Sequence, residues 1–250
     1  MSLGKSAPIP SSRLPRYRQI KIELANLLRD GKWKHGQAIP SEPLLAQRFS
    51  ASIGTVRKAV DELVAENILV REQGRGTFVK SHTRDYMLNA FFQIVDQDGH
   101  KELPRIRLLS FGKWRADAKT AALLRVPPRS AVLRVRNLLS IDGRPTVFDD
   151  IRLPPERFPG LTPNELSERD MTIYGLMQQR YGVTVVRIVE HLDAIGAPPA
   201  IAEQLEVAPG HPLLRIERTA YSYEGEPADM RFRYIRTGLR RYESVLGGHR

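Results

Sequence analysis

Arginine side chains occur in this sequence at two spacings that suit the binding of an anion. Arg134 and Arg136 lie two residues apart in "AVLRVRNLL", so in a β-strand both point from one face, while Leu133 and Val135 take the other. Two guanidinium groups on one sheet face offer planar sets of donors to a phosphate or carboxylate, although such a face can also be merely solvated. Arg75 stands between two glycines in "REQGRGTFV", where a hairpin tip would present it to a polyanion.

Other kinds of chemistry have little support in the sequence. There is no cysteine, the six histidines are scattered without the spacing of metal ligands, and no Ser/His/Asp or paired-carboxylate arrangement has a recognisable context. We therefore expect no catalytic residue, no metal site and no cofactor. The lack of cysteine, of an apolar N-terminal stretch and of a run of about 18 apolar residues favours a cytoplasmic protein without a membrane partner.

The composition is that of a globular protein with a basic surface. The 250 residues are 41% apolar and 27% charged, with a formal net charge of +11, which allows one large domain or two ordinary ones. The first 83 residues hold 14 Lys and Arg against 7 Asp and Glu, whereas the remaining 167 hold 25 against 21. A nucleic-acid partner is therefore expected to bind the first third of the chain.

Three helices and a hairpin are predicted in that first third. Apolar residues at helical spacing and the following Gly31 indicate a helix within 16–31. Ser41 and Ser52 are good N-caps for helices within 39–49 and 52–67, with Asn67 as a left-handed stop. The strands of the hairpin are expected at 68–73 and 76–80.

This order of elements predicts a winged helix-turn-helix. The tight "SAS" turn joins the second and third helices, and the third presents small and basic residues at its amino end. In a helix-turn-helix the amino end of the second helix approaches the bases of the major groove. Arg75, at the tip of the hairpin, would then reach into the minor groove, where negative potential is concentrated.

The segment "IPSEPLLAQRFSASIGTVRKAVDELVAENILVREQGRGTFV" closely resembles the DNA-binding domain of bacterial transcription regulators of the GntR family. The resemblance places Tyr17, Ser41, Thr55, Arg57 and Gly76 at DNA-contacting positions, and the helix start and the wing add further candidates. The residues that we expect to contact DNA are Tyr17, Ser41, Ser52, Thr55, Arg57, Lys58, Arg75, Gly76 and Thr77.

Two positions depart from the family pattern. Pro43 and Ile53 stand where the family commonly has arginines that read bases, and each lost bidentate guanine contact removes roughly 1 to 3 kcal/mol of discrimination. We therefore predict an operator unlike the usual half-site of the family, with Arg57, Lys58 and Arg75 contributing more of the binding.

An internal repeat dominates the rest of the chain. "LLRVPPRSAVLRVRNLLSIDGRP" at 123–145 and "QLEVAPGHPLLRIERTAYSYEGEP" at 204–227 share a helix end, a proline turn, a strand, a turn and a returning strand. Two such halves predict one antiparallel sheet built by duplication. "TIYGLMQQRYG" between them is expected to be a helix that starts at Thr172 and ends at Gly182.

This second pattern resembles the UTRA ligand-sensing domain of the HutC subfamily of GntR regulators, whose fold is like that of chorismate lyase. The matching segments include "LPPERFPGL" and "LLRIERTAYSYEGEP". The resemblance implies effector contacts at Arg134, Arg136, Thr172, Asp229 and Tyr234. Members that sense sugar phosphates usually carry Ser or Thr after a phenylalanine near the domain start, where this chain has Phe91 and Phe92, so a carboxylate with an apolar body is at least as well supported.

The sequence thus predicts an α+β protein in which an N-terminal winged helix-turn-helix (12–80) is joined by a linker (81–90) to an antiparallel-sheet α/β domain resembling chorismate lyase (91–246). The predicted function is that of a homodimeric repressor that binds an inverted-repeat operator in double-stranded DNA under the control of a small anionic effector. One alternative is an enzyme of the lyase fold acting on a small carboxylate. Another is a GntR regulator with an all-helical second domain, which the strand-rich repeat disfavours.

Overall fold

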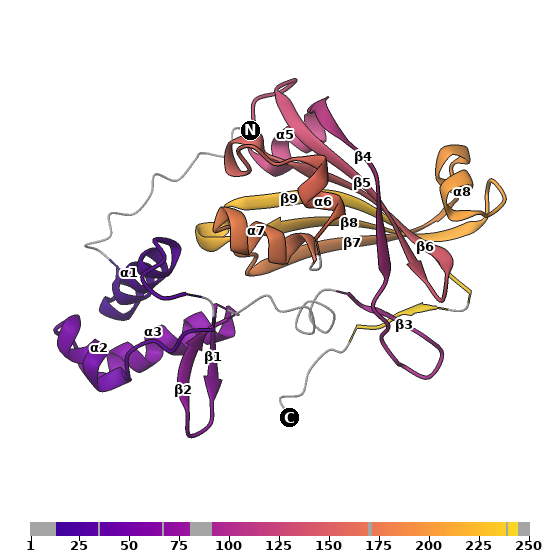
Figure 1. Ribbon diagram of the computed structural model, residues 1–250. Coiled ribbons are helices and arrows are strands. Elements are labelled where there is room, and N and C mark those ends of the chain that lie inside the picture. The colour runs from indigo at the N-terminus through magenta and orange to yellow at the C-terminus, as the bar shows by residue number, and fades with distance from the viewer. Residues whose placement is uncertain are drawn as a thin grey trace, which may run out of the picture. The chain divides into compact units, whose positions relative to one another are not determined.

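A computed structural model of the chain (Figure 1) describes residues 14–34, 36–66, 68–80, 92–169, 172–238 and 240–244. The chain divides into two compact units, Met1–Ser81 and His82–Arg250. The predicted linker at 81–90, the predicted helix stop at Asn67 and the first of the two phenylalanines, Phe91, lie outside the described residues.

The N-terminal unit contains the three predicted helices, α1 (Arg16–Arg29), α2 (Glu42–Arg48) and α3 (Ile53–Ala65). Ser52 caps α3, because its Oγ accepts a hydrogen bond from the backbone N–H of Thr55 at 3.1 Å. Ser41 occupies the N-cap position of α2, but its side chain makes no capping hydrogen bond. The side chains that join the three helices are almost fully buried, and they are Ile20, Leu24, Leu45, Val56, Val60 and Leu63.

The predicted hairpin follows α3 and forms the wing. Strand β1 (Leu69–Glu72) pairs antiparallel with β2 (Gly76–Val79), and Ala38 adds an isolated bridge to Phe78. Gly74 and Gly76 both have positive φ, at 72° and 122°, as the hairpin tip was expected to require. The winged helix-turn-helix predicted from the sequence is confirmed.

The C-terminal unit is built around a six-stranded antiparallel sheet with the order β4-β5-β6-β9-β8-β7. A second, two-stranded sheet pairs β3 with β10. The elements of this unit, in chain order, are β3 (Ile94–Val95), β4 (Arg105–Arg115), α5 (Ala118–Leu124), β5 (Ala131–Ile141), β6 (Arg144–Leu153), η2 (Pro155–Arg157), α6 (Pro163–Ser167), α7 (Ile173–Tyr181), β7 (Arg187–Gly196), α8 (Pro199–Leu205), β8 (Pro212–Tyr221), η3 (Tyr223–Gly225), β9 (Pro227–Arg236) and β10 (Arg241–Tyr242).

The strand order confirms the duplication predicted from the repeat. The first half contributes β4, α5, β5 and β6, the second contributes β7, α8, β8 and β9, and the halves meet where β6 pairs with β9. Each half also contains the same backbone hydrogen bond. In the first half the N–H of Ala116 donates to the carbonyl of Ser130, and in the second the N–H of Ala197 donates to the carbonyl of His211. Both helices α5 and α8 end at a residue of positive φ, Arg125 in one half and Glu206 in the other.

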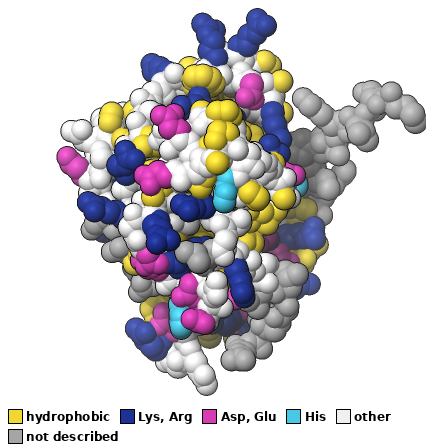
Figure 2. Space-filling view, turned by 90° about the vertical axis from the view of Figure 1, so that its right-hand side faces the viewer, with side chains coloured by type: hydrophobic (Ala, Val, Ile, Leu, Met, Phe, Trp, Pro, Cys, Tyr) yellow, Lys and Arg dark blue, Asp and Glu magenta, His cyan; other side chains and the backbone are white. Residues whose placement is uncertain are grey.

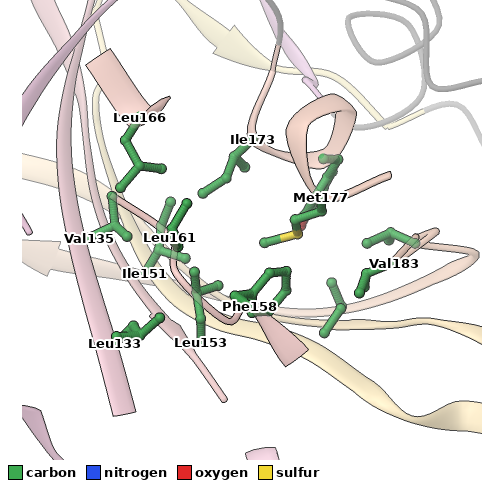
Figure 3. Packing of buried hydrophobic residues seen from close by; sticks show 14 residues of the cluster. Leu133, Val135, Ile151, Leu153, Phe158, Leu161, Leu166, Ile173, Met177 and Val183 are labelled. Carbon is green, nitrogen blue, oxygen red and sulfur yellow. The ribbon is translucent and has the colours of Figure 1, made fainter. Parts of the chain in front are cut away.

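Helices cover both faces of this sheet (Figure 1). Helices α6 and α7 pack on the face that carries Val135 and Ile151, which we call the α7 face, and their apolar side chains meet those of β5 and β6 there (Figure 3). Helices α5 and α8 pack on the opposite face, which we call the α5 face. Thr172 caps α7 through its Oγ1, and Gly182 ends the helix with a positive φ of 65°, as predicted.

Candidate DNA-contact surface and ligand site

The amino end of helix α3 presents the groups that a major groove would meet. Ser52, Arg57 and Lys58 are exposed, and Thr55 is half-buried. The Nζ atom of Lys58 lies 4.1 Å from the centre of the Tyr17 ring, so α1 and α3 bring together two of the predicted DNA contacts. The ring orders the lysine without neutralising its charge.

Glu42, the first residue of α2, fixes the side chain of Arg57. The Glu42 carboxylate accepts hydrogen bonds from Arg57 Nε and from Arg71 Nη2 of strand β1, each at 2.8 Å, and Arg71 also donates to Asp61 Oδ1 at 2.7 Å. Burial alone would raise the pKa of Glu42, but Arg71 and Arg57 outweigh it and hold the pKa below its ordinary value. One carboxylate therefore links helix α2, helix α3 and the wing.

The tip of the wing carries Arg75 as predicted. Its guanidinium is paired with the carboxylate of Glu72 and lies 5.5 Å from the centre of the Phe78 ring. The side chain of Arg75 remains 72% exposed, and Thr77 beside Gly76 is half-buried. Contact between Arg75 and a phosphate or base therefore competes with an acid of the same hairpin.

Replacing Glu72 with glutamine is expected to strengthen DNA binding by a factor of about 1.4 to 5 for each bound module, because an exposed ion pair of this kind is worth about 0.2 to 1 kcal/mol. Fluorescence anisotropy with a labelled duplex, taken from a random-sequence selection with this protein, measures the change. Glu62→Gln is the matched control, since it removes the same charge at a carboxylate bonded to Lys21 instead. Equal affinities of the two variants would contradict competition at the wing.

The five predicted effector residues lie on two opposite faces of the sheet. Arg134 and Arg136 do share a face, as expected, but their neighbours in the register place them on the α5 face. Tyr234 is on that face too, where its ring packs on Phe148. Asp229 lies on the α7 face, since it stands five positions before Tyr234 along β9 and an odd offset reverses the face. Thr172 starts the helix that covers that face.

On the α5 face, Arg134 is already occupied by protein groups. It donates two hydrogen bonds to the carboxylate of Asp150, at 2.7 and 2.5 Å, and its guanidinium lies 4.3 Å from the centre of the Trp114 ring. Arg136 is half-buried, and its Nε has no hydrogen-bond partner among the described residues. The two arginines therefore differ: Arg134 is paired with Asp150, whereas Arg136 has no carboxylate partner among the described residues.

A buried group of charged side chains occupies the centre of the α7 face. Arg233 donates two hydrogen bonds of 2.7 Å to Asp149, Arg231 Nε donates to Asp229 Oδ1 at 2.8 Å, and Arg218 Nε donates to Glu190 at 2.6 Å. The Arg231 guanidinium also lies 4.7 Å from the centre of the Tyr174 ring of α7. We call this the polar cluster, and its residues are Asn137, Asp149, Arg169, Tyr174, Glu190, Arg218, Asp229, Arg231 and Arg233.

Several atoms of the polar cluster have no hydrogen-bond partner among the described residues. Two are donors, Arg169 Nε and Arg231 Nη2, and two are acceptors, Asn137 Oδ1 and Asp229 Oδ2. Each buried, unpaired polar atom costs about 1 to 3 kcal/mol of stability. Polar groups left in this way often mark a place where another molecule supplies the missing partner.

Burial governs the electrostatics of the polar cluster. Desolvation, assisted by the nearby charge of Arg231, lowers the pKa of Arg169 to about 10, and desolvation raises the pKa of the Tyr174 phenol to about 12. Burial would raise the pKa of Asp149, but Arg233 and Arg231 outweigh it and the pKa is lowered. With four arginines against three carboxylates, the polar cluster keeps an excess of one positive charge.

The sequence contained a signal for the polar cluster. Arg231 and Arg233 lie two apart in "DMRFRYIR", the same spacing that singled out Arg134 and Arg136. Alternation says that two side chains share a face, but it does not say which face is buried or what covers it. Asp229 was expected from the family resemblance. No local pattern indicates the other six members, because they come from six separate segments: Asn137, Asp149, Arg169, Tyr174, Glu190 and Arg218.

Asp96, Asp98 and His100 bring their ligand atoms within 4.8 Å of one another in the loop after β3. Asp98 and His100 are exposed, and the Asp96 carboxylate already accepts two backbone N–H groups of the loop. The basic side chains do not gather into one patch on the face of the molecule that Figure 2 shows. Lys and Arg are interspersed there with acidic and apolar side chains.

Comparison with known proteins accounts for both units. Residues 16–79 match the family of bacterial regulatory proteins called gntR, and residues 99–238 match the UTRA domain. The chain belongs to the GntR family.

Relatives match this GntR protein over most of its length. The transcriptional repressor NagR of Bacillus subtilis is 27% identical over 228 residues, which is 90% of each chain. YurK of the same organism, described as an uncharacterised transcriptional regulator, is 28% identical over 219 residues, or 86% of this chain and 89% of its own.

A solved structure supports the same assignment for the C-terminal unit. The ligand-binding domain of a Bordetella bronchiseptica protein assigned to the GntR family is 34% identical, with a TM-score of 0.59. It covers 62% of this chain, and the match includes 96% of its own length.

The GntR protein is therefore a DNA-binding transcription regulator with an effector-binding domain, and the enzyme considered as an alternative is not supported by its family. The all-helical second domain is also excluded, because the C-terminal unit is built on a six-stranded sheet. Among the residues that the structure describes, no helix is long and apolar enough to cross a membrane.

Proposed function

We propose that this regulator is a repressor whose DNA affinity is set by a small anionic effector bound at the polar cluster. The observation that carries the proposal is the set of four buried polar atoms that have no hydrogen-bond partner in the described part of the chain, of which Asp229 Oδ2 belongs to a residue with no solvent exposure. The excess positive charge supports an anion, because Arg231 Nη2 and Arg169 Nε are donors that no described carboxylate accepts from.

The unpaired acceptors restrict the effector further. Asn137 Oδ1 and Asp229 Oδ2 require hydrogen-bond donors, so a bare carboxylate or phosphate would satisfy only half of the site. We therefore propose an effector with an anionic group at one end and a hydroxyl, ammonium or ring N–H at the other. Thr172, at the start of the helix that covers this face, supports the placement, since Tyr174 follows it by two residues and contacts Arg231.

A thermal-shift screen tests the site. Small hydroxy acids, amino acids and sugar phosphates are compared with analogues that lack either the anionic group or the donor. A ligand that binds only the folded protein raises the melting temperature, and we expect the rise to require both groups. Absence of any stabilising anion would contradict the proposal.

Variants then distinguish the two faces of the sheet. Asp229→Asn keeps the shape of the side chain and is expected to abolish the shift, whereas Arg136→Ala and Tyr234→Phe on the α5 face are expected to retain it. The reverse pattern would instead assign the effector to Arg134, Arg136 and Tyr234, the three of the five predicted effector residues that lie on the α5 face. Melting temperatures without ligand control for the stability of each variant.

The assembly that we propose is a homodimer, formed through the domain at 91–246, which holds two winged modules (12–80) on the half-sites of an inverted repeat. The linker at 81–90 would join the two. An effector that favours one arrangement of the modules changes DNA affinity by its differential binding to that arrangement.

Since the operator of a bacterial regulator lies on the chromosome, the compartment that we propose is the cytoplasm. Sedimentation with a single half-site and with an inverted repeat tests the assembly.

A further inference from the structure

Two large apolar side chains are exposed on the helix-turn-helix. Leu44 of α2 is 58% exposed and Ile53 of α3 is 45% exposed, whereas Leu45, Val56, Val60 and Leu63 of these helices are buried in the core. Isolated exposed apolar residues are common on protein surfaces and need no explanation. Ile53 differs because it is the first residue of the helix whose amino end approaches the bases.

The polar side chains around Ile53 already interact with other groups of the protein, whereas the Ile53 side chain is exposed. The Ser52 hydroxyl is used in capping and lies 2.8 Å from Thr55 Oγ1. Arg57, one turn further along, is bonded to Glu42. Gly54 follows Ile53, and outside its chain neighbours and its own helix backbone the one described atom within 4 Å of the point where a Cβ would lie is the Ser52 Oγ, at 4.0 Å. This open space allows a base pair to come close to the first turn.

An apolar group at this place selects among bases by a simple rule. In the major groove every base edge presents hydrogen-bond donors or acceptors, and only thymine adds a methyl group. A polar base edge set against isoleucine would lose its water without gaining a hydrogen bond, which is unfavourable. A thymine methyl set against isoleucine removes apolar surface of both groups from water.

We propose that Ile53 reads the methyl group of one thymine in each operator half-site. The position would thus be recognised by an apolar contact where the family commonly uses arginine. Burying one methyl group is worth about a fourfold change in affinity per contact, so removing the thymine methyl in both half-sites should weaken binding about sixteenfold. Ile53 is a specificity-determining residue in this view, and Leu44 is not required for it.

The experiment begins with selection of binding sites from random duplex DNA by the full-length protein. Each thymine of the selected half-site is then replaced in turn by deoxyuridine, which differs only by the missing methyl group. We expect one position per half-site at which the uracil duplex binds about fourfold more weakly. With Ile53→Ala the thymine and uracil duplexes should bind equally at that position.

Two further variants complete the test. Ile22→Ala removes an exposed isoleucine from helix α1, and it should leave the ratio of thymine to uracil affinities unchanged. Ile53→Arg should shift the selected base from thymine to guanine, which accepts two hydrogen bonds from arginine. The proposal is overturned if no thymine position responds to uracil, if the response persists in Ile53→Ala, or if selection enriches no sequence.

Discussion

Replacing Arg231 with methionine is expected to lower the free energy of unfolding of the C-terminal unit by about 3 to 5 kcal/mol, because removing one partner of a buried ion pair leaves the other charge uncompensated. Arg231 is 2% exposed and neutralises Asp229, which has no exposure, and it lies 4.0 Å from Asp149. Methionine fills a similar volume, so the loss reports the charge rather than a cavity.

Urea unfolding measures this loss through the fluorescence of Trp114, which packs on Arg134 in the sheet. A Trp33→Phe background leaves Trp114 as the only indole of the chain. Arg136→Met is the matched control, since it removes an arginine from the same sheet that makes no ion pair among the described residues; it should cost less than about 1 kcal/mol.

The double variant Arg231→Met with Asp229→Leu completes the cycle. It should recover much of the lost stability, because replacing both members of a buried pair with apolar groups is often close to neutral. If Arg231→Met and Arg136→Met were equally stable, the polar cluster would not have the electrostatic role assigned to it.

Raising the salt concentration from 50 to 200 mM is expected to weaken operator binding about 10³-fold if two modules each set three cations against phosphates. We expect those cations to be Arg57, Lys58 and Arg75, and six of them predict a slope of log K against log salt of about −5. Anisotropy titrations at four or more salt concentrations give this slope.

The same slope reports how many modules bind. A single bound module would predict a slope of about −2.7 and a loss of about 40-fold over the same range. Lys58→Ala should reduce the slope of the dimer by about 2, since it removes one phosphate contact from each module. A slope that is unchanged in this variant would place Lys58 away from the phosphates.

Local patterns predicted the fold well because each element carries its own signals. The N-cap at Ser52, the glycines of the wing and the repeated proline turns are all short-range features, and each is present in the structure. The duplication was visible for the same reason, since both halves kept the residues that set their turns.

The polar cluster, which we propose as the ligand site, was harder to predict because it depends on long-range packing. The register slips at bulges next to Leu139 and Ala220, so the row of side chains that crosses the sheet cannot be counted from the hairpin turns alone. Arg134 and Arg231 look alike in sequence, and only the helices above them decide which is buried. The odd spacing of Asp229 and Tyr234, in contrast, was readable in advance as a sign that they face apart.

The pairing of β6 with β9 brings the two halves of the repeat together in one sheet, and this affects how the sheet could bind a small molecule. Two identical halves related by a twofold axis would present the same groups twice, which suits a symmetrical molecule. Here the halves have diverged on the α7 face: Asn137 of β5 corresponds in the repeat to Arg218 of β8. The two halves keep the same backbone arrangement but carry different side chains. A surface of this kind can distinguish the two ends of a small asymmetric molecule.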